Sequence, residues 1–185
     1  MRIISGKAKG TKLETLEGLD TRPTLDRVKE ALFSIIQNEL WEAKVLDLFS
    51  GSGALGLESL SRGAKEAYLC DSSKKAIEII KQNVKKTHFE EQVKIINNDY
   101  KKCLEEVKNE QFDIIFLDPP YRTNFGIEAV KFIIQNNIIT KDGTIIFETD
   151  KKEEEYLSEL EKYASIRGLR KYGRVSLVIL SQGKE

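Results

Sequence analysis

The sequence predicts an α/β fold, with one mainly parallel seven-stranded sheet, helices on both faces and an antiparallel C-terminal strand. Two observations carry this prediction. From Lys44 onward, short apolar runs alternate with stretches whose apolar residues recur at helical spacing, which is the pattern of right-handed βαβ units. Near the C-terminus, only the tight turn "YGR" separates two expected strands, so at least one strand pair there is expected to be antiparallel.

The elements follow in order from this pattern. Residues 1–42 are expected to form a small N-terminal extension of short extended pieces and one helix, whose apolar stripe runs from Leu25 to Ile36. Residues 43–185 are expected to form the main domain, in one structural unit with the extension. The expected strands are 44–49, 66–71, 92–99, 112–117, 143–149, 164–172 and 175–181. The expected helices of the main domain are 53–63, 73–86, 102–107, 126–135 and 152–161.

Composition limits the class of protein. The chain has 185 residues, 40% of them hydrophobic and 32% charged, which is ordinary for one globular domain. No apolar run approaches the roughly 20 residues of a membrane span, and the N-terminus has no apolar signal region. We therefore expect a cytoplasmic protein that does not bind membranes. Two cysteines and one histidine are too few for a zinc site, so no metal is expected.

The charge is zero in sum but uneven along the chain. Residues 1–12 contain Arg2, Lys7, Lys9 and Lys12 with no acid, and residues 162–184 are also basic without an acid. Such ends suggest a local patch that meets an anionic polymer. A solvated basic surface with no partner is the alternative.

A glycine-rich loop follows the first expected strand of the main domain. In "DLFSGSGALG" the glycines satisfy G-x-G-x-x-G, and Asp71 ends the next strand, 20 residues after Gly51. This is the dinucleotide fingerprint, so an NAD-dependent oxidoreductase is one hypothesis. Asp47 argues against it, because a carboxylate would repel a pyrophosphate. S-adenosylmethionine carries a sulfonium and an ammonium, and a nearby carboxylate suits both.

The stretch "FDIIFLDPPYRTN" is the second motif. An apolar strand ends at Leu117, and a carboxylate, two prolines and an aromatic ring follow. Pro119 and Pro120 have fixed φ angles and no amide donors, so they stiffen the chain between Asp118 and Tyr121. The carboxyl end of a strand is where ligands bind in sheets of this kind.

Together these motifs resemble the Rossmann-like class I S-adenosylmethionine-dependent methyltransferases, and within them the amino-group methylators marked by [D/N]-P-P-[Y/F]. The chain is more similar still to the RsmD family of bacterial small-subunit ribosomal RNA (guanine-N2)-methyltransferases. The resemblance rests on "RIISGKAKGTKL", "TRPTLDRVKEALF", "DLFSGSGALGLESLSRGA" and "FLDPPY", and it covers essentially the whole chain. Ser73 departs from the family, which more often has a second acid or asparagine there, and Asp71 stands where glutamate is common.

The resemblance implies methyl transfer to the exocyclic 2-amino group of a guanine in 16S ribosomal RNA. Asp118 and the carbonyl of Pro119 would accept the two N–H bonds of that amino group, and Tyr121 would stack on the flipped base. The expected partners are ribosomal RNA and the small ribosomal subunit, and we expect a monomer. The residues alone also allow N6-adenine methylation of DNA or RNA, or an RNA-binding protein without catalysis.

The expected site residues fall into three groups. The catalytic group is Asp118, Pro119, Pro120 and Tyr121. The group expected to bind S-adenosylmethionine is Asp47, Ser50, Gly51, Gly53, Asp71, Asp99, Tyr100 and Thr24. The group expected to bind RNA is Arg2, Lys7, Lys9, Lys12, Arg22, Arg27, Arg122 and Arg170. Thr24 and Asp99 each have a second interpretation, as the N-cap of the helix that follows.

Overall fold

The computed structural model describes residues 1–16, 23–121 and 123–183, and of residues 23–25 it describes the main chain alone. Within that part the strands are β1 (Lys44–Asp47), β2 (Glu66–Asp71), β3 (Val93–Asn97), β4 (Phe112–Leu117), β5 (Ile139–Thr149), β6 (Ala164–Tyr172) and β7 (Val175–Gln182). The helices are α1 (Pro23–Ile36), η1 (Gln37–Glu39), α2 (Ala54–Ser61), α3 (Lys74–Thr87), α4 (Tyr100–Glu106), α5 (Phe125–Gln135), η2 (Glu153–Glu155) and α6 (Leu157–Leu160).

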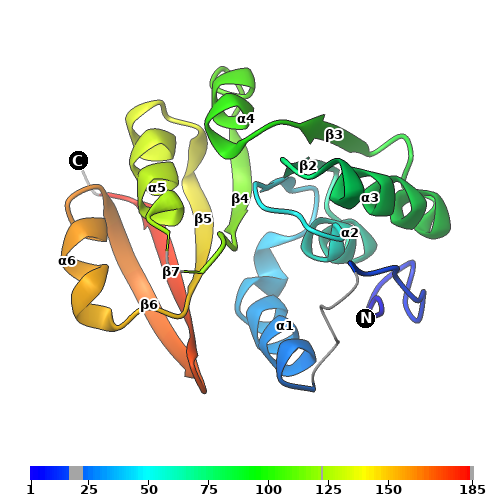
Figure 1. Cartoon of the computed structure of the whole chain (residues 1–185), viewed down its shortest axis with the longest axis horizontal. Coiled ribbons are helices and arrows are strands. Elements are labelled where there is room, and N and C mark those ends of the chain that lie inside the picture. Colours follow the sequence, from blue (N-terminus) through cyan, green and yellow to red (C-terminus); the bar gives the residue numbers. More distant parts are fainter. Residues whose placement is uncertain (17–22, 122, 184–185) are drawn as a thin grey trace.

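The described strands form one seven-stranded sheet in the order β3-β2-β1-β4-β5-β7-β6 (Figure 1). The five strands from β3 to β5 are parallel, and β7 is antiparallel to both of its neighbours. The predicted fold class and the antiparallel C-terminal strand are therefore confirmed. β1 and β4 are adjacent, and the helices that follow them, α2 and α5, pack on opposite faces of the sheet. A crevice therefore forms at the carboxyl ends of these two strands.

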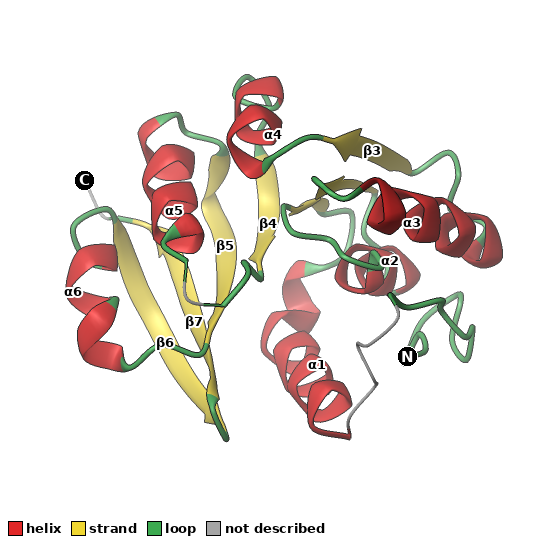
Figure 2. Cartoon of the chain, in the orientation of Figure 1, coloured by secondary structure: helices red, strands yellow, loops and turns green. Residues whose placement is uncertain are grey.

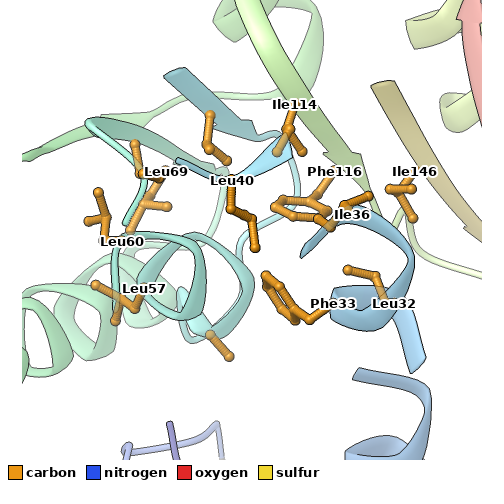
Figure 3. Packing of buried hydrophobic residues seen from close by; sticks show 14 of the residues in the cluster. Leu32, Phe33, Ile36, Leu40, Leu57, Leu60, Leu69, Ile114, Phe116 and Ile146 are labelled. Carbon is orange, nitrogen blue, oxygen red and sulfur yellow. The ribbon is translucent and has the colours of Figure 1, made fainter. Parts of the chain in front are cut away.

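Each face of the sheet has its own hydrophobic core. Helices α1, α2 and α3 pack on one face, where Phe33 of α1 meets Phe116 of β4 with ring centroids 5.9 Å apart (Figure 3). Helices α4, α5 and α6 cover the other face (Figures 1 and 2). Residues of β1, β4 and β5 contribute alternately to the two cores, as the two-residue period of a strand requires.

The first residues of the chain form a short antiparallel hairpin. Arg2 bridges to Lys12, and the buried residues Ile3 and Leu13 join the core beneath α1 and α2. The tip of the hairpin lies against the end of α2, where the Lys7 N–H donates to the Ser61 carbonyl oxygen at 2.8 Å. The hairpin therefore shares one continuous core with the sheet.

Several elements differ from their expected bounds, most of them by one or two residues at an end. β1 ends at Asp47 rather than at residue 49, because the chain leaves the sheet to form the glycine loop. β5 begins earlier, at Ile139, where it pairs with Phe112. The single helix expected over residues 152–161 is instead a 3₁₀ turn followed by α6, and the fully buried Tyr156 lies between them. No helix in the described residues is long and apolar enough to cross a membrane.

Candidate active site

A cavity of about 820 Å³ lies at the carboxyl ends of the parallel strands. The loops that follow β1, β2, β3 and β4 line it, together with one face of α1 and the N-terminal residues Met1, Thr15 and Leu16. All but one of the described residues predicted for catalysis or cofactor binding line this cavity. The exception is Gly53, which forms the turn into α2 behind it. The two motifs found in the sequence therefore meet in one place.

The glycine loop has a backbone that requires glycine at two positions. Gly51 and Gly53 have φ angles of 56° and 80°, in the left-handed region that other residues avoid. The Gly51 N–H donates to Asp71 Oδ2 at 2.9 Å, and the Ser73 N–H donates to Asp71 Oδ1 at 2.9 Å. Asp71 thus holds the loop in place. A carboxylate oxygen can accept two hydrogen bonds, so each oxygen of Asp71 can accept a further bond from a ligand in the cavity.

Asp47, at the end of β1, is buried without a partner. Its side chain is 1% exposed, and neither carboxylate oxygen has a hydrogen-bond partner among the described residues. The Ser50 hydroxyl donates instead to the Asp47 main-chain carbonyl at 2.7 Å. Burial and the nearby charge of Asp118 raise the pKa of Asp47 to about 8, and the Gly56 N–H and Ser50 hydroxyl, which do not reach hydrogen-bonding geometry with its carboxylate, offset this only in part. An unpaired buried carboxyl that lines a cavity is suited to a cationic ligand.

The sequence Asp118–Tyr121 leaves β4 at the edge of the cavity. The Asp118 side chain is accessible from the cavity, yet protein surrounds it, and this burial raises its pKa to about 6. Pro119 is buried, and the carbonyl of Pro120 accepts a hydrogen bond from the Thr123 hydroxyl at 2.8 Å. Tyr121 is 55% exposed, so its ring is available to a ligand rather than packed in the core.

Glu148 is a cavity residue that the sequence analysis missed. Leu117 of β4 pairs with Phe147 of β5. Asp118, directly after β4, and Glu148, within β5, therefore lie at the same level of two neighbouring parallel strands. Burial and the charge of Asp118 raise the pKa of Glu148 to about 8. With Asp47 on β1, three carboxyl groups follow one another on adjacent strands. The one available signal was a lone acid in the apolar run "IIFET".

The loop after β3 contributes an aromatic wall. Tyr100 stacks on Phe125 with ring centroids 4.7 Å apart, and its hydroxyl donates to Glu128 at 2.6 Å. Asp99 is the N-cap of α4, because its Oδ1 accepts the N–H groups of Lys101 and Lys102, each at 3.0 Å. Asp99 therefore caps α4, as one of its two interpretations expected. Binding of the cofactor by Asp99 stays a prediction.

The predicted RNA-binding residues are divided among different places. Arg2 and Lys12 are exposed at the open end of the hairpin, next to Met1, which lines the cavity. Lys7 and Lys9 are exposed at its tip, by the far end of α2.

The other predicted RNA-binding residues lie on the main elements of the fold. Arg27 is exposed on α1, and Arg170 is exposed on β6. Because β6 runs in the same direction as β5, Arg170 lies near the carboxyl edge of the sheet. Arg22, Arg122 and the side chain of Thr24 lie outside the described residues.

A second buried carboxylate, Glu58 of α2, was also missed. Its oxygens accept the N–H groups of Ile4 at 2.8 Å and Ser5 at 3.0 Å, and it pairs with Lys29 at 3.0 Å and Arg62 at 2.8 Å. Lys29, 4% exposed, also donates to the Arg2 carbonyl at 3.2 Å and lines the cavity. This network joins the hairpin, α1 and α2 behind the site. Within the described residues no group of three or more metal-ligating side chains is suited to hold a metal ion.

Comparison with known proteins agrees with this geometry. The model of the family described as conserved hypothetical protein 95 matches residues 1–181. A ribosomal RNA small subunit methyltransferase D from Haemophilus influenzae is 37% identical over 153 residues, which are 82% of this chain and 79% of that protein.

Solved structures share the fold. A candidate methyltransferase from Escherichia coli superposes with a TM-score of 0.88 at 30% identity, over 100% of this chain and 99% of that one. A candidate methyltransferase solved in complex with SAH, 17% identical, shares the fold over 80% of this chain and 49% of its own, with a TM-score of 0.65. The chain therefore belongs to the conserved hypothetical protein 95 family, the RsmD family that its motifs resemble.

Proposed function

We propose that the protein transfers a methyl group from S-adenosylmethionine to the exocyclic 2-amino group of a guanine in 16S ribosomal RNA of the small ribosomal subunit. The observation that carries the proposal is the pairing, in one cavity, of an unpartnered buried carboxyl at Asp47 with the stiffened acceptor corner Asp118–Pro119. The first suits a cationic cofactor and the second suits an amino group. The methyltransferase D relative supports the choice of ribosomal RNA.

The described residues fit the proposed cofactor. Asp47 offers an unpaired buried carboxyl, and a ligand with an ammonium and a sulfonium would favour its ionised form. Gly51 has no side chain, and a Cβ there would point into open space, so its backbone is free to approach the ligand. Asp71 would accept hydrogen bonds from ribose hydroxyls, and the Tyr100 region would flank the adenine. When bound, S-adenosylmethionine supplies a methyl group activated by its positively charged sulfur.

The chain's own residues then act on the amino group. An exocyclic amino nitrogen is a weak nucleophile, because its lone pair is delocalised into the purine ring. Asp118 and the Pro119 carbonyl would accept its two N–H bonds and direct the lone pair into the cavity. The two prolines hold these acceptors in position before the substrate arrives, which is preorganisation. Tyr121, with its exposed ring, would stack on the base.

The alternatives are N6-adenine methylation and NAD-dependent oxidation. The acceptor corner would serve an adenine 6-amino group by the same chemistry. NAD is disfavoured, because its pyrophosphate would meet the carboxyl of Asp47 at the end of β1, and Asp118–Tyr121 would have no role.

The test is to incubate the full-length protein with labelled S-adenosylmethionine and either small ribosomal subunits or protein-free ribosomal RNA. The RNA is then digested and its nucleosides are identified. We expect label in N2-methylguanosine. Label in N6-methyladenosine would replace guanine by adenine in the proposal. Calorimetry gives a second test: S-adenosylhomocysteine should bind and NAD should not, and preferential binding of NAD would refute the methyltransferase.

A further inference from the structure

We propose that Glu148 is a specificity-determining residue, which accepts the ring N1–H of the target guanine while Asp118 accepts a hydrogen from its 2-amino group. This inference rests on the proposed function, and it adds the group that distinguishes guanine from adenine.

Asp118 and Glu148 lie at corresponding positions of adjacent strands. β4 and β5 are parallel neighbours, about 4.8 Å apart, and Phe116 pairs with Ile146 while Leu117 pairs with Phe147. Phe116 and Ile146 both face the α1 side of the sheet, as their membership of the same core shows (Figure 3). Two residues further on, Asp118 and Glu148 continue that side and both line the cavity. The two carboxyl groups therefore lie side by side, at the same level along the two strands.

The described part of the protein offers Glu148 no compensating positive charge. Glu148 is half-buried, and the two causes that raise its pKa are burial and the charge of Asp118, with no offsetting cation in the described part of the chain. The negative charge of the same region also acts on Tyr121. Burial raises its pKa, and so do the charges of Glu148, Asp118 and Asp150. A half-buried acid beside a second acid is costly to the empty protein, and a ligand with adjacent donors would satisfy both.

Guanine and adenine differ in the hydrogen-bond donors that they present. On its Watson–Crick edge guanine presents N1–H next to the 2-amino group, so two donors are contiguous. Adenine presents its 6-amino group next to N1, which is an acceptor. When Glu148 is ionised, two adjacent carboxylates match the first pattern and oppose the second, since one of them would face a lone pair. Protonated Glu148 has an O–H that can donate to that lone pair, so the preference for guanine should grow with pH. A site built to accept a hydrogen bond discriminates strongly against a base that lacks the donor.

The decisive probe is 2-aminopurine, which keeps the 2-amino group but has an unprotonated N1. Once nucleoside analysis has located the methylated guanine, small subunits are reconstituted with guanine or 2-aminopurine at that position. With the wild-type protein we expect guanine to be methylated about 10- to 100-fold faster in kcat/KM. With Glu148→Gln we expect this ratio to fall severalfold or more, because the amide can turn its NH₂ toward the N1 lone pair.

A matched control and a pH profile separate this role from a structural one. Asp150→Asn changes an exposed acid just beyond the same strand and should leave the ratio unchanged. The carboxylate is the accepting form, so guanine methylation should rise with pH as Glu148 ionises around its pKa of about 8, and Glu148→Gln should lose that rise. Asp118 and Tyr121 interact electrostatically with Glu148, and none of the titratable groups in the cavity lining is altered in this variant. Besides these two, that lining contains Lys29, Asp47, Asp71, Asp99, Tyr100 and Lys101.

In Glu148→Gln the melting temperature should not fall below that of the wild type, and S-adenosylhomocysteine affinity should be unchanged. Glu148→Ala serves as a second variant that removes both hydrogen-bonding groups. If the wild type makes N2-methylguanosine and both variants keep the wild-type ratio, the inference is wrong and the proposed function stands. If the wild type makes N6-methyladenosine, the guanine assignment and this inference are both wrong.

Discussion

Glu58 and Asp47 are both carboxylates with almost no exposed surface, 0% and 1%, yet the protein treats them in opposite ways. Glu58 has four partners, two backbone N–H groups and the side chains of Lys29 and Arg62. Burial raises the pKa of Glu58, but its partners, led by Lys29, more than offset this, and the pKa lies below its usual value. Asp47 has no such partners, and burial together with Asp118 raises its pKa to about 8.

The difference separates a structural region from a ligand-binding one. A fully hydrogen-bonded buried carboxylate fixes the elements that surround it, here the hairpin, α1 and α2. An unsatisfied one costs free energy in the empty protein, and such groups concentrate where a ligand supplies the missing charge. Asp47 is of the second kind, and Asp118 and Glu148 line the same cavity, each with its pKa raised by the surrounding protein. Substitutions should therefore affect stability in the first region and activity or binding in the second.

The largest effect should come from Glu58→Ala. Removing the carboxylate leaves the buried Lys29 and two backbone N–H groups unpaired, so the free energy of unfolding should fall by about 3–5 kcal/mol. Urea denaturation measures this change. Glu105→Ala removes an exposed pair with Lys108 and should change stability by about 0.5 kcal/mol or less. Equal effects of the two variants would contradict the structural role of Glu58.

Asp118→Ala should reduce catalysis without a comparable loss of stability. By analogy with deleting one preorganised donor, we expect kcat to fall by about 10²–10³-fold, or roughly 3–4 kcal/mol. Asp118→Asn should be milder, because its amide oxygen still accepts a hydrogen bond. Single-turnover methyl transfer to small subunits gives the rate, and S-adenosylhomocysteine binding should be nearly unchanged. Full activity in the alanine variant would remove Asp118 from the mechanism.

Asp47→Asn should stabilise the empty protein and weaken cofactor binding. In the unfolded chain Asp47 ionises near its ordinary pKa of 3.8, whereas in the folded protein it does so only near 8. Stability is therefore lost progressively as pH rises between these values, and the variant avoids this loss. We expect a gain of about 1–3 kcal/mol at pH 8, shrinking toward zero by pH 4. Thermal melts across this pH range test the sign, and calorimetry should show weaker S-adenosylmethionine binding.

The sequence predicted best those elements whose local pattern and tertiary environment agree. The strands 66–71 and 112–117 have the expected bounds, because continuous apolar runs end at polar or proline residues. The helix expected over 152–161 is interrupted, because Tyr156 turns into the core beside Phe147, with ring centroids 6.3 Å apart. Burial of this one ring outweighs the helical propensity of the charged residues around it.

For the site, the sequence located the two motif loops but not the residues that complete them. Asp47, Gly51 and Asp118 lie within contiguous motifs, so spacing alone identified them. Glu148 belongs to the site only because β5 lies beside β4, a pairing between distant segments that no local pattern reveals. The same holds for Lys29 and Glu58, which come from different helices.

The smallest effects should come from the N-terminal hairpin, which Glu58 holds against the core. Arg2 and Lys12 lie at its end near the cavity, whereas Lys7 and Lys9 lie at its tip beside Ser61. If RNA enters the cavity, the double reversal Arg2→Glu/Lys12→Glu should reduce the salt dependence of RNA binding more than Lys7→Glu/Lys9→Glu.

The slope of log K against log salt is negative, and its magnitude should decrease by about 0.7–0.9 for each phosphate that the protein no longer neutralises. Filter binding at several salt concentrations measures the slopes, with S-adenosylhomocysteine affinity as the control. A larger effect of the tip pair would mean that RNA approaches along α2, and no effect of either pair would mean that these basic residues are solvated surface.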